Sequence, residues 1–233
     1  IEPFLGKPMI KVITGLRRCG KSCFLQQIIQ RLRTKHGMAA DDIIAIDKES
    51  LDFESIANAR DLNEYVRQRR KRAKRNACLL VDEVQEIEGW EKAITSLFKP
   101  GDLDIIITGS NAHMLSSELA TLLSGRYVEF PLQTLSFAEF LEFREGKAGE
   151  RDAEFQLYLR YGGFPALHLF DLKDETVYQY ISAIYSTILL KDIVRRYDIR
   201  NVALLENIGR YLFDNIGNMV SANRIAQYLP SQR

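Results

Sequence analysis

The sequence predicts an α/β fold in which helices cover both faces of a parallel sheet. Two observations carry this prediction. Apolar segments of strand length alternate with amphipathic segments of helix length through the first half of the chain, an order typical of parallel sheets. The apolar segments are also continuous rather than alternating, which indicates strands buried on both faces.

Five apolar segments are the expected strands. The first is followed by a glycine-bounded loop and a helix over about Lys21 to Lys35, and the second by a polar helix over about Asp61 to Arg75. In chain order, the predicted strands are Met9 to Thr14, Ile43 to Asp47, Cys78 to Asp82, Ile105 to Thr108 and Tyr127 to Pro131.

After Pro131 the pattern changes from mixed to helical. Ser136 and Glu139 have the spacing of a capping box, so a domain boundary is expected near residues 134–136. The helices expected beyond it are Phe137 to Glu145, Ala153 to Tyr161, Glu175 to Arg196, Val202 to Asn215 and Asn223 to Leu229.

The loop after the first strand fits the pattern G-x-x-x-x-G-K-[ST] and predicts a phosphate-binding loop. Its glycines allow backbone N–H groups to turn toward phosphate oxygens, and the helix N-terminus adds positive potential. Lys21 is expected to reach the β and γ phosphates of ATP, and the Ser22 hydroxyl to ligate Mg²⁺. The predicted nucleotide-binding residues are Gly15, Leu16, Arg17, Arg18, Cys19, Gly20, Lys21, Ser22 and Cys23. Arg17 and Arg18 are unusual in such a loop, and they either face phosphate or a neighbouring subunit, or remain solvated.

The third strand ends in two acidic residues, Asp82 and Glu83, as in a Walker B motif. Asp82 is expected to hold Mg²⁺ through water, and Glu83 to polarise the water that attacks the γ-phosphate. Alternatively, the two carboxylates only cap the next helix. Together with the phosphate loop they indicate hydrolysis, because nucleotide binding alone has no use for the second acid.

Two further features extend the predicted site. Ser110 and Asn111 follow the fourth strand, and either is expected to stand beside the attacking water if that strand lies between the first and the third. Arg126 precedes the fifth strand, where a guanidinium would neutralise phosphate charge in cis or across a subunit interface. A salt-bridged surface arginine is the alternative for Arg126.

The segment from Arg67 to Arg75 holds seven basic residues in nine. Such a block resembles a nucleic-acid footprint. It also ends a predicted helix, where cations interact favourably with the helix dipole. It lacks interleaved aromatic residues, so a solvated helix face is the favoured interpretation. The histidines are scattered without acids or cysteines at ligand spacing, which speaks against a metal site built from them.

Composition restricts the partners and the compartment. The formal net charge of +1 reflects 32 basic and 31 acidic residues, so binding to nucleic acid or to an anionic membrane would need a local patch. No apolar run is long enough to span a bilayer and no signal segment opens the chain. Three cysteines without paired spacing suggest reduced thiols, and the expected location is the cytoplasm.

Five motifs in order resemble those of prokaryotic AAA-superfamily P-loop ATPases, relatives of the origin-recognition and STAND ATPases. They are GLRRCGKS, LLVDEVQEI, IIITGSNAHML, LLSGRYVEFPLQTLSFAEFL and YLRYGGFPAL. The resemblance implies a core sheet of order 5-1-4-3-2 in residues 1–134, a helical lid in 135–200 and the start of a winged-helix domain in 201–233. It implies the same nucleotide-site roles for Lys21, Ser22, Asp82 and Glu83, with Ser110 or Asn111 as sensor and Arg126 after it.

Residues 204–233 resemble the opening of a winged helix, with Ser221 as the cap of its first helix, so DNA is an expected partner through a segment that continues beyond Arg233. The lid-arginine candidates are Arg160, Arg195 and Arg196. The leading hypothesis is a Mg²⁺-dependent ATPase that moves its lid and C-terminal domains. The alternatives are a slow-turnover switch holding ATP or ADP that recruits DNA, protein or a second copy of the chain, and a small-molecule kinase.

Overall fold

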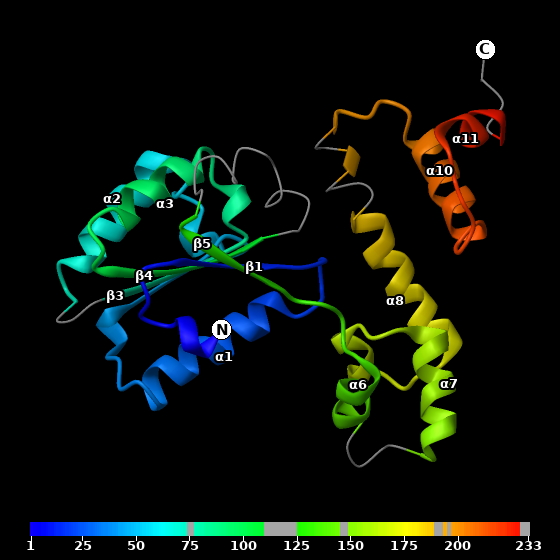
Figure 1. The fold of residues 1–233 in the computed structure, drawn as a ribbon, viewed down its shortest axis with the longest axis horizontal. Coiled ribbons are helices and arrows are strands. Elements are labelled where there is room, and N and C mark those ends of the chain that lie inside the picture. The colour runs from blue at the N-terminus through cyan, green and yellow to red at the C-terminus, as the bar shows by residue number, and fades with distance from the viewer. Residues whose placement is uncertain (74–76, 110–124, 145–148, 189–192, 195–196, 229–233) are drawn as a thin grey trace. The chain divides into compact units, whose positions relative to one another are not determined.

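The computed structural model describes residues 1–73, 77–109, 125–144, 149–188, 193–194 and 197–228. The chain divides into two compact units, Ile1–Leu169 and Phe170–Arg233, which are described separately below (Figure 1). Among the described residues, no helix combines the length and the apolar character needed to cross a bilayer.

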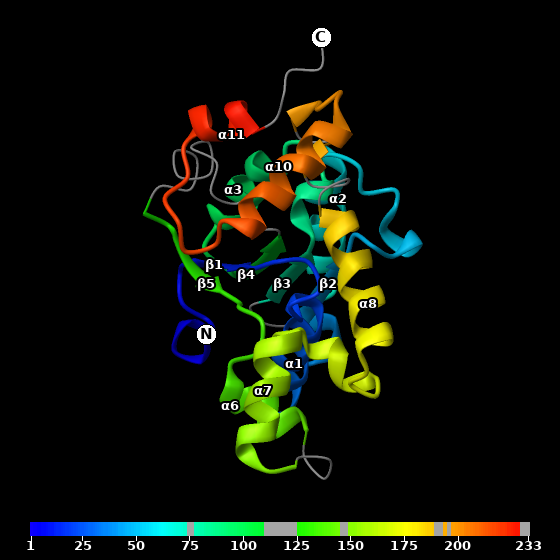
Figure 2. The same ribbon diagram turned by 90° about the vertical axis from the view of Figure 1, so that its right-hand side faces the viewer.

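The first unit contains a five-stranded parallel sheet of order β2-β3-β4-β1-β5, visible nearly end-on in Figure 2. This is the predicted order, read from the opposite edge. Nearly every residue of the central strands is buried, which explains their continuous apolar sequences. The strands are β1 (Ile10–Thr14), β2 (Ile43–Asp47), β3 (Ala77–Asp82), β4 (Leu103–Gly109) and β5 (Tyr127–Pro131).

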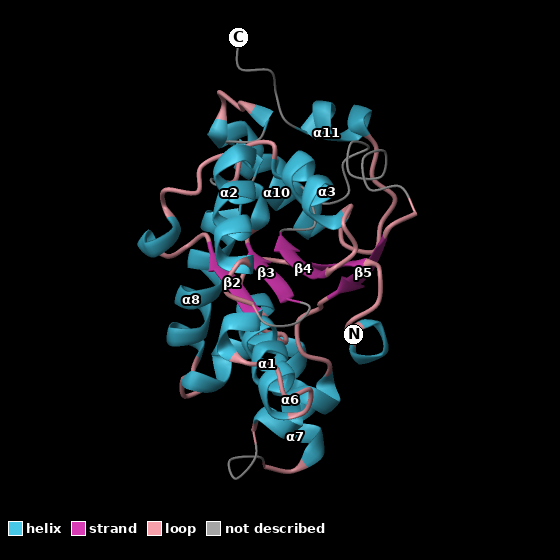
Figure 3. Ribbon diagram, turned by 90° about the vertical axis from the view of Figure 1, so that its left-hand side faces the viewer, coloured by secondary structure: helices cyan, strands magenta, loops and turns pink. Residues whose placement is uncertain are grey.

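Helices cover both faces of this sheet (Figure 3). One face packs against α1 (Lys21–Thr34) and the other against α2 (Ala59–Arg70) and α3 (Trp90–Phe98), each with its own apolar core. A capping box of Asn58 and Asp61 starts α2, two residues before the predicted start. The sequence analysis does not predict α3, a helix of nine residues that comes after the acidic pair at the end of β3.

Short 3-10 helices also occur in this unit. They span Glu2–Phe4 (η1), Ala40–Asp42 (η2), Leu51–Phe53 (η3) and Val84–Glu86 (η4). The last of these directly follows the two acids at the end of β3, and Glu83 itself has φ 52°, so the chain turns sharply at the site described below.

A helical segment follows the sheet within the first unit. It comprises α6 (Phe137–Phe143), α7 (Arg151–Tyr161) and the 3-10 helix η5 (Pro165–Leu169). The predicted capping box of Ser136 and Glu139 is present. The boundary expected near residues 134–136 lies inside this compact unit, and the predicted division into core, lid and winged helix stays a prediction.

An ion pair and a group of ring contacts hold the helical segment together. Arg144 donates to both carboxylate oxygens of Glu154, at 2.8 and 3.1 Å, and these hydrogen bonds lower the pKa of Glu154. His168 packs between the rings of Phe140 and Phe143, with centroids 4.7 and 5.5 Å away. Burial lowers its pKa because the charged imidazolium loses solvation there.

The second unit is helical in its described part. It contains α8 (Asp174–Thr187), α10 (Val202–Asp214) and α11 (Ala222–Tyr228). The ring of Tyr185 packs against that of Phe213, with centroids 5.6 Å apart. The Ser221 hydroxyl accepts a hydrogen bond from the Arg224 N–H at 3.3 Å, the contact expected of the predicted cap.

Candidate functional site

The loop between β1 and α1 is shaped by close backbone approach. A Cβ added to Gly15 would lie 2.4 Å from the carbonyl oxygen of Leu132 and 2.8 Å from the Cys19 sulfur, so only glycine fits there. Arg18 and Gly20 have φ values of 66° and 106°, which turn the chain into α1.

The N-terminus of α1 is left available for an anion. Its N-cap is Gly20, no side chain caps it, and no acidic residue occupies its first turn. Helix N-termini carry unpaired N–H groups and positive potential. Ser22 and Cys23, in this first turn, are exposed. The end of α1 therefore has the donors that a phosphate group needs.

Lys21 is buried at the centre of the site. Its ammonium nitrogen lies 3.2 Å from the carbonyl oxygens of Gly15 and Leu16 and 3.2 Å from a carboxylate oxygen of Glu83. Only 4% of its surface is exposed. A cation held in this way needs anionic partners, because burial of an unpaired charge is costly.

Thr108 connects the two acids that end β3. Its hydroxyl donates to Asp82 Oδ1 and accepts from the Glu83 N–H, at 3.0 Å for the second bond. Gln85 donates from its side-chain amide to the other carboxylate oxygen of Glu83. All of these groups lie at the carboxyl edge of the sheet, where ligands of open α/β folds bind.

The remaining loop residues take different positions. Leu16 and Arg18 are exposed, and Arg17 lies 3.8 Å from Glu49 across an ion pair. Cys19 is buried, and burial raises the pKa of its thiol. The side chains of Leu16 and Arg18 thus face solvent, whereas the Cys19 thiol is buried under the loop.

Other predicted residues either lie outside the described part of the chain or have their described contacts elsewhere. Ser110 and Asn111 lie outside the described residues, as do Arg195 and Arg196. Arg126 is described and exposed; its carbonyl oxygen accepts from the Ile10 N–H at 2.8 Å. Of the arginines considered for the lid, Arg160 is described, and its guanidinium lies 5.7 Å from the centre of the Tyr161 ring. The roles of these residues stay predictions.

Sequence reasoning missed three residues near the loop. Thr108 was read only as a strand end. Glu129 on β5 accepts a hydrogen bond from the Thr14 hydroxyl at 2.7 Å. Pro165 comes within 3.8 Å of where a Gly20 Cβ would lie. A threonine ending a buried strand was the available signal for Thr108; the other two depend on pairings that a single sequence does not reveal.

The donor set suits a magnesium ion that is shared with phosphate. Mg²⁺ in such sites takes one or two protein oxygens, with water and phosphate oxygens completing its coordination. Asp82 supplies a carboxylate and Ser22 an exposed hydroxyl. In the described part of the chain, no group of three His, Cys, Asp or Glu residues forms a metal cluster.

Comparison with known proteins places the chain in a family. A family model described as an AAA domain matches residues 7–141, and one described as a domain of unknown function (DUF8612) matches residues 152–233. An uncharacterized protein of Haemophilus influenzae is 38% identical over 99% of this chain and 57% of its own length. An uncharacterized protein of Methanocaldococcus jannaschii is 35% identical over 94% of this chain and 50% of its own. The chain thus spans about half the length of these relatives.

Among solved structures, the chain is similar to RuvB of Thermotoga maritima, with a TM-score of 0.49, 15% identity, and coverage of 94% of this chain and 74% of the other. It is also similar to the Aeropyrum pernix ORC1 protein in complex with DNA, with a TM-score of 0.43, 14% identity, and coverage of 95% and 76%.

Proposed function

Because the chain belongs to the AAA domain family, whose fold suggests a nucleotide-binding ATPase, we propose that it binds ATP with Mg²⁺ and hydrolyses it to ADP and phosphate. Lys21, Ser22, Asp82 and Glu83 are the residues to which we assign this work. The change of nucleotide then moves the helical segment after the sheet and the C-terminal part of the chain.

One observation carries the proposal. The buried Lys21 ammonium and the buried Glu83 carboxylate lie 3.2 Å apart at the end of the sheet, directly beneath an uncapped helix N-terminus. A phosphate group that enters this site meets a cation, backbone N–H groups and a carboxylate at once. A turn with only a structural role would not require a buried lysine beside a buried glutamate, because burying two charged groups is costly.

Each residue has a separate task in the reaction. Lys21 and the loop N–H groups bind and orient the phosphates. Ser22 and Asp82 would hold Mg²⁺, which neutralises charge on the phosphate oxygens. Glu83 accepts a proton from the water whose oxygen bonds to the γ-phosphorus, while the bond from that phosphorus to the ADP oxygen breaks.

Contacts within the first unit support coupling between the loop and the helical segment. The Leu132 N–H donates to the Thr14 carbonyl oxygen at 2.6 Å, and the Leu135 N–H donates to Gly163 at 2.7 Å. Pro165, which starts η5, lies beside Gly20. A nucleotide that changes the loop backbone therefore acts directly on the chain that leads into and out of α6 and α7.

The test is phosphate release by Glu83→Gln, measured beside ATP binding. Loss of a general base typically lowers the rate by about 100-fold or more, whereas a neutral amide leaves binding intact or stronger because it removes a negative charge. Glu86→Gln is the matched control, since Glu86 is exposed three residues along the same turn. Equal phosphate release by wild type and Glu83→Gln, with ATP still bound, contradicts hydrolysis at this site.

A slow-turnover switch is the second candidate. Both carboxylate oxygens of Glu83 have partners: one contacts Lys21 and the other accepts from the Gln85 amide. One of these two contacts must therefore break before Glu83 can act as a base. The switch would recruit DNA through the segment 201–233, a protein, or a second copy of the chain. Gln85→Ala is expected to speed turnover by at least about tenfold, because a hydrogen bond to a charged group contributes about 1.5–3 kcal/mol. Unchanged turnover contradicts this restraint.

A further inference from the structure

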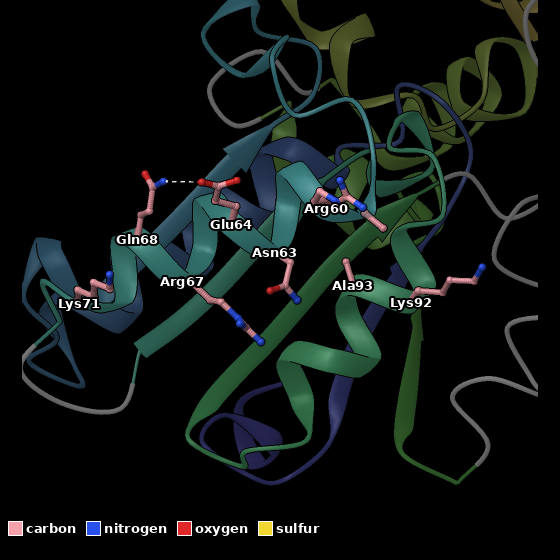
Figure 4. A pocket seen from close by; sticks show the side chains of 9 residues that line it. Arg60, Asn63, Glu64, Arg67, Gln68, Lys71, Lys92 and Ala93 are labelled. Carbon is pink, nitrogen blue, oxygen red and sulfur yellow. Dashed lines mark hydrogen bonds between the residues drawn. The ribbon is translucent and has the colours of Figure 1, made fainter.

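A basic groove runs between α2 and α3, on the face of the sheet opposite α1 (Figure 4). Its hollow measures about 670 Å³. Alanines 59 and 93 line it, and their short side chains leave space between the two helices. Asn63 and Arg67 point from α2 toward α3, whereas Lys92 points away from α2 (Figure 4). The described lining residues with cationic or amide side chains are Arg60, Asn63, Arg67, Gln68, Lys71 and Lys92.

The basic residues of α2 fall into two groups. Arg69 lies over the ring of Tyr65 at 5.5 Å and donates to its hydroxyl at 3.3 Å, and Arg70 forms an ion pair with Asp102. Arg60, Arg67 and Lys71 instead share the groove-facing stripe, at the spacing of one helix face. The first group serves the fold, whereas the second faces outward.

The cations of the groove are not neutralised by their surroundings. Arg60, Arg67, Lys71 and Lys92 are all exposed, and no described residue forms an ion pair with any of them. Among the described residues that line the groove, the single acid is Glu64, which accepts a hydrogen bond from Gln68 at 3.2 Å. Four cations and one carboxylate give a local charge of +3 in a chain with a net charge of +1.

The dimensions and chemistry of the groove fit a phosphate backbone. From Arg60 to Lys71 the helix extends about 16 Å at 1.5 Å per residue, close to five base-pair steps of about 3.4 Å. Asn63 and Gln68 add amide donors of the kind that contact phosphate and sugar. The described lining residues include no aromatic side chain on which single-stranded bases would stack, and no large exposed apolar residue to anchor a protein chain.

We infer that the α2–α3 groove binds the phosphate backbone of a nucleic-acid duplex, without reading its sequence. Four cations contact four phosphates, and the amides fix the position of the strand. None of the described lining residues belongs to the loop or to the acids of the nucleotide site, so we expect this binding not to require ATP.

The test measures binding of a labelled 20-base-pair DNA duplex by fluorescence anisotropy between 50 and 200 mM KCl. Release of counterions from four phosphates gives a slope of log affinity against log salt of about −3.6 from the groove alone, or a loss of about 150-fold over this range. Arg67→Gln combined with Lys71→Gln is expected to weaken binding at 50 mM and to reduce the slope by about 1.8. Two unrelated duplex sequences are expected to bind alike.

The matched control is Lys7→Gln combined with Arg33→Gln, which removes the same charge at exposed positions that do not line the groove. ATP binding, measured for all variants, verifies that the nucleotide site is intact and keeps this test separate from that of hydrolysis. The inference is overturned if the duplex does not bind at 50 mM, or if the groove and control variants lose the same affinity. A last comparison uses polyglutamate as an acidic polypeptide. The inference is also overturned if Arg67→Gln with Lys71→Gln weakens binding to polyglutamate but leaves binding to DNA unchanged.

Discussion

Replacement of Thr108 by valine tests the arrangement at the end of β3. Thr108 is fully buried, and its hydroxyl joins Asp82 to the Glu83 N–H. Valine has nearly the same shape but no hydroxyl. The substitution therefore leaves the packing in place and removes only the two hydrogen bonds.

The magnitude follows from the two lost bonds. A hydrogen bond to a charged carboxylate contributes about 1.5–3 kcal/mol, and a buried N–H left without a partner costs about 1–3 kcal/mol. Thr108→Val is thus expected to reduce the free energy of unfolding by at least about 3 kcal/mol and to lower Tm by roughly 6–12 °C for a chain of this size. Phosphate release should fall as well, because Asp82 and Glu83 lose their common anchor.

The assay uses urea unfolding followed by the fluorescence of Trp90. This is the single tryptophan of the chain, and it is buried in the core on the α2–α3 face of the sheet, so its emission reports on the first unit. Thr95→Val serves as a control. Thr95 lies on α3, the helix that carries Trp90, and its hydroxyl donates to the Glu91 carbonyl oxygen of the same helix. This substitution is expected to cost about 0.5 kcal/mol or less.

Thr108→Ser decides between hydrogen bonding and apolar burial as the source of the effect. Serine keeps the hydroxyl and loses one methyl group, worth about 1 kcal/mol. Burial alone would make valine the more stable variant, whereas the contacts of Thr108 make serine the more stable by about 2 kcal/mol. A valine variant as stable as the serine variant would refute the reasoning.

Three further predictions follow from the loop and the helical segment. Gly15→Ala forces a Cβ to 2.4 Å from the Leu132 carbonyl oxygen and should weaken ATP binding at least tenfold by calorimetry; Gly149→Ala, with its nearest contact at 3.6 Å, should not. Iodoacetamide should alkylate the exposed thiol of Cys23 well before the two buried ones, whose pKa values are raised by burial; equal rates by mass spectrometry would contradict the burial. The pKa of His168 is lowered by burial, so the folded state binds fewer protons than the unfolded one. Stability should therefore be fully present above about pH 6.5 and decline as the pH falls through the folded-state pKa. His168→Leu should flatten that decline in urea titrations, and an unchanged slope would count against it.

The strands were predictable from sequence because burial on both faces leaves a local signature. Apart from Lys11 in β1 and Asp104 in β4, the central strands are short and mainly apolar, and the loop motif lies between the first of them and a helix. The strand order came from the resemblance to a family rather than from periodicity. The helix α3 escaped prediction because it is only nine residues long and follows two glutamates and a glycine.

The contacts inside the site were not predictable in the same way. Lys11 is a charged residue in the middle of β1, yet it is fully buried because Asp104 on the neighbouring strand pairs with it. Thr14 likewise finds Glu129 more than a hundred residues later. Such partners are separated widely in sequence, and only the strand order and register bring them together. A single sequence identifies the residue types but not these pairs.

The basic run after residue 66 illustrates why the partners of a charge matter more than its count. From sequence it is one block of cations, and a solvated helix face was the favoured interpretation. In the structure, Arg69 and Arg70 stabilise the fold through Tyr65 and Asp102, whereas Arg67 and Lys71 line the groove. A variant that removed the whole block would lose packing and phosphate contacts together. The separation of α2 into these two groups is what allows duplex binding to be tested without unfolding the helix that carries it.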